Sequence, residues 1–223
     1  MGLHEREELV AMNTARKGFY EFLASVYKVE LTEEQIESLA KCDLPADDEF
    51  VGAGYSAVKE YLRHRDSGTR QELAVDYARV FLGAGMYEQI TAPPYESVYT
   101  SERRLLMQEA RAEVLATLRE NELKRGNWNE AEDHIALELE FMQRMALRAA
   151  EALSDNAEDE AIAYLRTSYD FLENHLLNWV PMLVADMRMH ARTLFYQGLG
   201  QLTLGSLQED EAVLRELLDS VEA

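Results

Sequence analysis

Two sets of side chains in this sequence could do chemistry, and the first has metal-ligand spacing. His134 and Glu138 lie four positions apart, which on a helix brings their β-carbons within about 6 Å. Imidazole and carboxylate at that spacing could hold a metal ion, completed by His175 or Asp133. The zinc pattern HExxH is absent, and none of the five histidines follows a Glu by three positions as a di-iron bundle requires. A metal-dependent helical enzyme using His134 and Glu138 is therefore the alternative, and no metal ligand is predicted.

Ser97 is the second candidate, as a nucleophile. No glycine elbow surrounds it, and its triad partners would be Asp133 and His134, adjacent residues that point in different directions on a helix. We interpret Ser97 as a turn hydroxyl or a donor to a bound peptide. The sequence predicts a binding protein that has no catalytic residue and needs no cofactor.

The segment from Tyr77 to Tyr99 has the composition of a binding surface. A helix-like run contains Tyr77 and Phe81, and the following loop closes on Pro93-Pro94-Tyr95-Glu96-Ser97-Val98-Tyr99. Consecutive prolines fix the backbone and remove donors, while tyrosines offer apolar area with a polar tip. We expect Tyr77, Phe81, Pro94, Tyr95 and Tyr99 to form an apolar wall. The alternative is that Tyr95 and Tyr99 fill the core beneath a long loop.

A second helix start follows, at Asn127 to Met142. Asn127 or Asn129 could cap it, and Glu130, Glu132 and Asp133 suit the positive end of a helix dipole. Asp133 and His134 would then lie in the first turn, at the mouth of the cleft that the loop covers. A capping Asp and a core His are the structural alternative.

Apolar residues recur at helical spacing along most of the chain, so helices must position these side chains. Thr32 and Gln35 form a capping-box pattern, and Pro181 implies a kink or a new helix start at 179–181. No alternation of strand length stands out. We predict an all-α, single-domain bundle of about ten helices spanning 1–223, with helices near 5–29, 32–41, 48–64, 69–82, 101–124, 130–153 and 157–177, and two or three more over 182–221.

Composition and charge narrow the partners. The chain has 223 residues, enough for one sizeable core, and 42 acidic against 22 basic residues give a formal net charge of −20. The negative field of such a protein opposes binding to nucleic acid and to anionic membranes, and it attracts a basic peptide. The alternative is that the acidic residues only keep the protein soluble.

The lack of a recognisable secretion signal and the single cysteine favour a cytoplasmic location. Cys42 is the only cysteine, so no intrachain disulfide can form. The charged first residues lack the apolar core of a secretion signal, and no apolar run is long enough to span a bilayer. We therefore expect a cytoplasmic protein without stable membrane insertion.

Four blocks of sequence carry a family resemblance. In chain order they are Tyr77-Ala78-Arg79-Val80-Phe81-Leu82-Gly83, Pro93 to Tyr99, Glu132-Asp133-His134 with Glu138, and Phe171-Leu172-Glu173-Asn174-His175-Leu176-Leu177-Asn178-Trp179-Val180-Pro181. Together they resemble the TorD/DmsD family of cytoplasmic chaperones, over roughly residues 73–200.

The resemblance implies a function without chemistry. Members of this family attend the maturation of molybdopterin oxidoreductases, of the DMSO/TMAO reductase type, that the twin-arginine route exports. The expected partners are the twin-arginine signal peptide and the apo form of such an enzyme, and the resemblance also allows a homodimer. An assembly scaffold for another cytoplasmic partner is a further alternative. The predicted peptide-binding residues are Tyr77, Phe81, Pro94, Tyr95, Glu96, Ser97, Tyr99, Asp133, His134 and Glu138, with the acidic ones meeting the basic end of the peptide.

Overall fold

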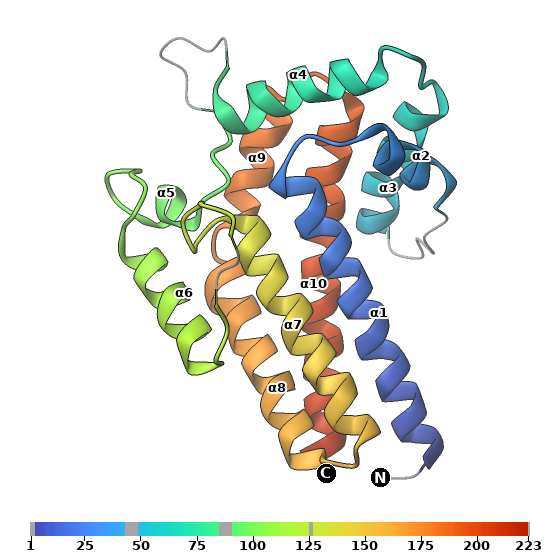
Figure 1. Ribbon diagram of the computed structural model, residues 1–223, viewed down its shortest axis with the longest axis vertical. Helices are drawn as coiled ribbons and strands as arrows, with labels where there is room; N and C mark the ends of the chain where they lie inside the picture. The colour runs from blue at the N-terminus through green and yellow to red at the C-terminus, as the bar shows by residue number, and fades with distance from the viewer. Residues whose placement is uncertain (1–2, 43–48, 85–90, 125–126, 223) are drawn as a thin grey trace. The chain divides into compact units, whose positions relative to one another are not determined.

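The computed structural model describes residues 3–42, 49–84, 91–124 and 127–222 (Figure 1). Within these ranges the chain forms ten α-helices, one π-helical turn and no strand longer than an isolated bridge, so the all-α prediction is confirmed. The elements are α1 (Leu3–Lys28), α2 (Glu33–Lys41), α3 (Glu49–Arg63), α4 (Thr69–Leu82), α5 (Glu96–Thr100), α6 (Glu109–Glu120), α7 (Ile135–Ser154), α8 (Glu158–Phe171), η1 (Leu172–Leu176), α9 (Val180–His190) and α10 (Leu194–Glu222).

The helices group into two compact units. The first unit comprises Met1–Ser25, Tyr95–Asn178 and Leu207–Ala223, and the second comprises Val26–Pro94 and Trp179–Ser206. Helices α1 and α10 contribute residues to both units. The prediction of one domain spanning 1–223 stays a prediction.

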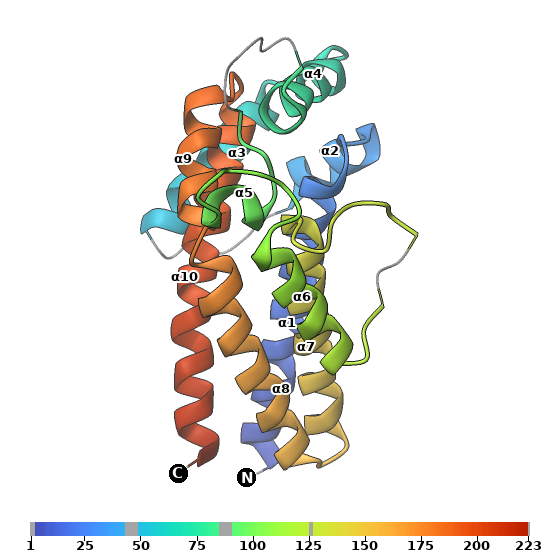
Figure 2. The ribbon, with the colours of Figure 1, turned by 90° about the vertical axis from the view of Figure 1, so that its left-hand side faces the viewer.

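In the first unit, long helices run side by side. Figures 1 and 2 show α7, α8 and the first-unit parts of α1 and α10 packed along their lengths. The inward stripe of α7 contains Ile135, Leu139 and Met142, all with no exposed surface, which is the burial that an amphipathic helix needs to be stable. Between α1 and α10, Arg16 Nε donates to Asp210 Oδ1 at 2.6 Å in an almost fully buried ion pair.

In the second unit, two glycines allow a close helix crossing. A β-carbon on Gly198 of α10 would lie 2.7 Å from the carbonyl oxygen of Gly54 in α3, and one on Gly54 would lie 2.4 Å from the amide nitrogen of Leu202. Real β-carbons do not approach backbone atoms so closely, so the crossing depends on both residues having no side chain.

The helix ends agree with the sequence signals in several places. Thr32 and Gln35 form the predicted capping box at α2, and α4 has the predicted bounds and ends at Gly83 with a φ of 69°. Pro181 occupies the first turn of α9, so it starts a new helix. The start of the third helix, expected at 48, lies outside the described residues, and the described helix α3 begins at Glu49.

The helix predicted over 101–124 is wrong in its first third. Helix α6 begins only at Glu109, and the preceding residues form a loop in which Arg104 and Met107 have φ angles of 51° and 62°. Such left-handed residues cannot continue an α-helix. The hydroxyl of Ser101 accepts the Leu105 amide hydrogen at 3.2 Å, which offers the backbone an alternative to the helical bond.

Candidate functional site

The predicted loop ends in a short helix that a distant segment caps. Tyr95 is extended and forms an antiparallel bridge with His134, in which Glu96 N donates to Asp133 O at 3.0 Å. Asp133 Oδ2 also accepts from Ser97 N at 2.9 Å and from the Ser97 hydroxyl. Tyr95 supplies no side-chain cap of its own, so Asp133 satisfies the first amides of α5. The two predicted regions within the first unit are therefore in direct contact.

His134 is the N-cap of α7, and its ring is enclosed. Nδ1 accepts from Ala136 N at 3.0 Å, so the other ring nitrogen carries the proton in the neutral form. The rings of Tyr95 and Trp128 meet the imidazole edge-on at 4.9 and 4.7 Å between centroids. The expected caps Asn127 and Asn129 are wrong, because the helix starts later, at Ile135.

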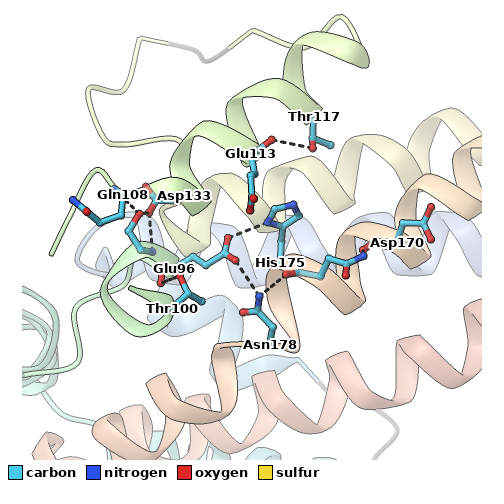
Figure 3. A network of polar contacts seen from close by, with 11 residues as sticks. Glu96, Thr100, Gln108, Glu113, Thr117, Asp133, Asp170, His175 and Asn178 are labelled. Carbon is cyan, nitrogen blue, oxygen red and sulfur yellow. Dashed lines mark hydrogen bonds and ion pairs between the residues drawn. The ribbon is translucent and has the colours of Figure 1, made fainter. Parts of the chain in front are cut away.

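Glu96 joins α5 to the π-helical turn. Its Oε2 lies 3.1 Å from His175 Nδ1, and its Oε1 accepts from Asn178 Nδ2 at 3.3 Å (Figure 3). Asn178 also donates to the Asn174 carbonyl oxygen at 2.5 Å. The side chain of Glu96 is only 2% exposed, and a buried carboxylate needs such partners. We call Glu96, Ser97, Asp133, His175 and Asn178 the Glu96 cluster.

A hollow opens beside this cluster on the same unit. Its volume is about 460 Å³, and its lining includes Glu96 and Asn178 from the cluster. In Figure 3, Glu113 extends from α6 toward the His175 ring. We call this feature the acidic hollow, and its charged lining consists of Glu96, Glu102, Arg103, Glu109 and Glu113. Four carboxylates against one guanidinium favour a cationic ligand.

The structure divides the ten predicted binding residues between the units. The first unit contains Tyr95, Glu96, Ser97, Tyr99, Asp133, His134 and Glu138, and the second contains Tyr77, Phe81 and Pro94. Only Tyr95 and Tyr99 are partly exposed, and the other eight are buried. The peptide-binding role of these ten residues stays a prediction.

Tyr77 and Phe81 are core residues of the second unit. Their rings lie 5.0 Å apart, and each packs against Tyr196, at 6.2 and 5.7 Å respectively. Tyr77 also donates to the Tyr27 carbonyl oxygen at 3.0 Å. Both residues are only 5% exposed, so in this structure they pack inside the second unit.

The groups considered for catalysis are engaged in structural contacts. Among the described ranges, no three His, Cys, Asp or Glu side chains are grouped so that they could hold a metal ion. His134 Nδ1 is already an acceptor for a backbone amide, and the Ser97 hydroxyl donates to Asp133 and accepts from Gln108 N at 3.2 Å. This arrangement suits positioning rather than nucleophilic attack.

Sequence reasoning missed the role of His175 and Asn178. The ring of His175 lies 4.7 Å from that of Phe171. The π-helical turn at Leu172–Leu176 adds a residue to the helical repeat, which periodicity alone does not reveal. The segment quoted for the family resemblance contains both residues and was the available signal.

Comparisons with known proteins show the family of this chain. The chain belongs to the nitrate reductase delta subunit family, whose model matches residues 44–185. It is 28% identical to the chaperone protein TorD of Vibrio cholerae over 95% of this chain and 97% of that protein. The chaperone protein TorD of Vibrio parahaemolyticus is 26% identical over 93% and 98%, and that of a Psychrobacter species is 26% identical over 98% and 100%.

These matches confirm the resemblance to TorD/DmsD-type chaperones, and they extend it from residues 73–200 to almost the whole chain. The relatives are named as chaperones, consistent with a protein that is not an enzyme. None of the helices in the described ranges combines the length and apolarity needed to cross a bilayer.

Proposed function

We propose that this protein is a cytoplasmic maturation chaperone that binds the twin-arginine signal peptide and the apo form of a molybdopterin oxidoreductase of the DMSO/TMAO reductase type. It would assist cofactor insertion and hold the enzyme back from export until it is complete. The TorD-type family supports the chaperone role. The acidic hollow beside the Glu96 cluster is the observation that supports a basic peptide as the ligand.

The hollow has the chemistry that a cationic leader needs. Glu102, Glu109 and Glu113 are exposed, so a ligand can reach them without unfolding the site. Guanidinium groups match carboxylates in charge and in planar geometry, which is why arginine suits such a surface better than lysine. Helix α5 and the Asp133 cap hold Glu96 at the rim of the hollow.

An apolar surface adjoins the acidic one. Leu105, Leu106 and Met107 follow one another in the loop before α6 and are 47 to 60% exposed. Three consecutive exposed apolar side chains offer contact to the apolar part of a leader. A peptide that buries about 1,000 Å² here would bind with roughly micromolar to high-nanomolar affinity after its ordering cost, which permits release to the exporter.

Calorimetric titration with the signal peptide of a molybdoenzyme encoded beside this gene tests the proposal. We expect binding that weakens with added salt, because exposed charges are screened. Glu109→Gln combined with Glu113→Gln should weaken it about threefold to tenfold. The control is Glu151→Gln combined with Glu216→Gln, which changes the net charge equally at exposed positions of the same unit. Absence of binding to any such peptide would remove the proposal.

A further inference from the structure

The loop before α6 repeats the chemistry of the ligand that we propose. It reads Arg103-Arg104-Leu105-Leu106-Met107, two adjacent arginines followed by three apolar residues. A twin-arginine leader has the same order of groups, a basic pair and then an apolar stretch. The chain therefore carries, on its own surface, a segment with the composition of its proposed partner.

The two arginines lie at different features of the first unit. Arg103 lines the acidic hollow together with Glu102, Glu109 and Glu113. The guanidinium carbon of Arg104 lies 5.6 Å from the centroid of the Tyr99 ring, within the range of a cation–π contact. Two neighbouring residues thus reach the two features: Arg103 lines the hollow and the Arg104 guanidinium lies over the Tyr99 ring.

The loop is fixed in place by the Glu96 cluster. Ser97 Oγ, which donates to Asp133, accepts the Gln108 amide hydrogen at 3.2 Å. At the other end, Ser101 Oγ accepts from Leu105 N, and the Gln108 side chain donates to the Leu106 carbonyl oxygen at 2.8 Å. These bonds hold Arg104 and Met107 in left-handed conformations that side chains rarely adopt. The segment is presented in a specific shape and is not a loose connector.

We propose that the acidic hollow and the Tyr99 face are paired subsites for two adjacent guanidinium groups, and that Arg103 and Arg104 occupy them until a client's leader displaces them. This inference rests on the proposed function and gives it a regulatory part. The internal segment competes with weak or incorrect peptides for the same carboxylates. A peptide that supplies both arginines fills the two subsites that Arg103 and Arg104 leave, and its apolar run contacts the exposed Leu105, Leu106 and Met107.

Competition lowers the apparent affinity by the fraction of molecules whose subsites are free. Removing the internal arginines should therefore tighten binding. The test is calorimetric titration of the full chain carrying Arg103→Gln and Arg104→Gln with the signal peptide used above. We expect the dissociation constant to fall about threefold to tenfold relative to the unsubstituted chain.

The control variant loses the same number of positive charges, but at positions outside the loop before α6. Arg70→Gln with Arg119→Gln also deletes two exposed positive charges, so it measures the general gain from a more acidic protein. A peptide with lysines in place of its two arginines should gain little from the loop substitutions, because the subsites match guanidinium groups.

The outcomes separate the two hypotheses. If the unsubstituted chain binds no leader, the proposed function fails and this inference fails with it. If it binds the leader but the loop variant binds no tighter than the charge control, or binds more weakly, the internal competition is refuted and the proposed function stands. All four substituted arginines are exposed, and unchanged thermal unfolding checks that the variants fold.

Discussion

Asp133 accepts two hydrogen bonds from Ser97, 36 positions earlier in the chain, through the same carboxylate oxygen. Both residues have no exposed surface. This contact joins the start of α5 to the segment before α7. Through Ser97 it also reaches Gln108, at the end of the loop before α6. The acidic hollow therefore depends on a buried polar contact beneath it.

Replacing Asp133 should destabilise the fold. Asp133→Ala leaves the Ser97 amide and hydroxyl as buried donors without an acceptor, which costs about 1–3 kcal/mol. Urea unfolding followed by circular dichroism measures the loss. Asp155→Ala, at an exposed helix end, is the control and should change the free energy of unfolding by less than about 0.5 kcal/mol. Equal effects of the two substitutions would contradict this role of Asp133.

Gly198 should not tolerate a methyl group. The added β-carbon would lie 2.7 Å from Gly54 O and 2.8 Å from the Ala57 side chain, so Gly198→Ala should cost about 1–3 kcal/mol of unfolding free energy through overpacking. Gly18 lies in α1, where an added methyl group would meet nothing within 4 Å, and Gly18→Ala should stabilise by about 0.5–1 kcal/mol. Thermal unfolding of both variants distinguishes them, and a stable Gly198→Ala protein would rule out the close crossing.

The Arg16–Asp210 pair should be a larger stability determinant than surface pairs. Asp210 also accepts from the Tyr20 hydroxyl at 2.6 Å, and Asp210→Ala leaves the buried Arg16 charge uncompensated, at a cost of about 3–5 kcal/mol. Glu211→Ala breaks the surface pair with Arg215 on the next turn and should cost less than about 1 kcal/mol. Denaturant titration of both variants gives the comparison, and similar losses would show that Arg16 is solvated.

Stability should fall at alkaline pH. Burial raises the pKa of Tyr27 above its ordinary value of 10.0, against the smaller lowering by its bond to Thr203. A group whose folded pKa is raised stabilises the protein fully below its unfolded pKa, and this contribution is lost as pH rises from about 10 toward the folded pKa. Tyr27→Phe should make the decline less steep in urea titrations between about pH 8 and 11, although it loses the Thr203 bond at every pH. An alkaline slope that is identical in Tyr27→Phe and the unsubstituted chain would contradict the linkage.

Helical periodicity was sufficient to predict the fold class and most helix positions. Residues such as Ile135, Leu139 and Met142 mark a buried face directly, because burial of an apolar stripe is what stabilises a helix in a protein. Capping signals also worked where they are local, as at Thr32 and Gln35. These features depend on neighbours within one or two turns.

The site was less predictable because long-range contacts define it. Asp133 caps α5 from 36 positions away, and Glu96 meets His175 across 79 positions. The loop before α6 was predicted as helix, because the competing bonds to Ser97 and Ser101 form only in the folded site. The π-helical turn at Leu172–Leu176 changed the direction of His175 in a way that a repeat of 3.6 residues does not indicate.

The most direct test of the account is hydrogen–deuterium exchange of the full chain with and without saturating signal peptide. Binding at the acidic hollow predicts slower exchange concentrated in residues 96–113, with the Gln108 and Leu105 amides among those affected, because the peptide covers the loop there. The same peptide with both arginines replaced by lysine should give weaker protection in this range. A peptide that binds tightly while residues 96–113 exchange at an unchanged rate would contradict the placement of the leader at this site.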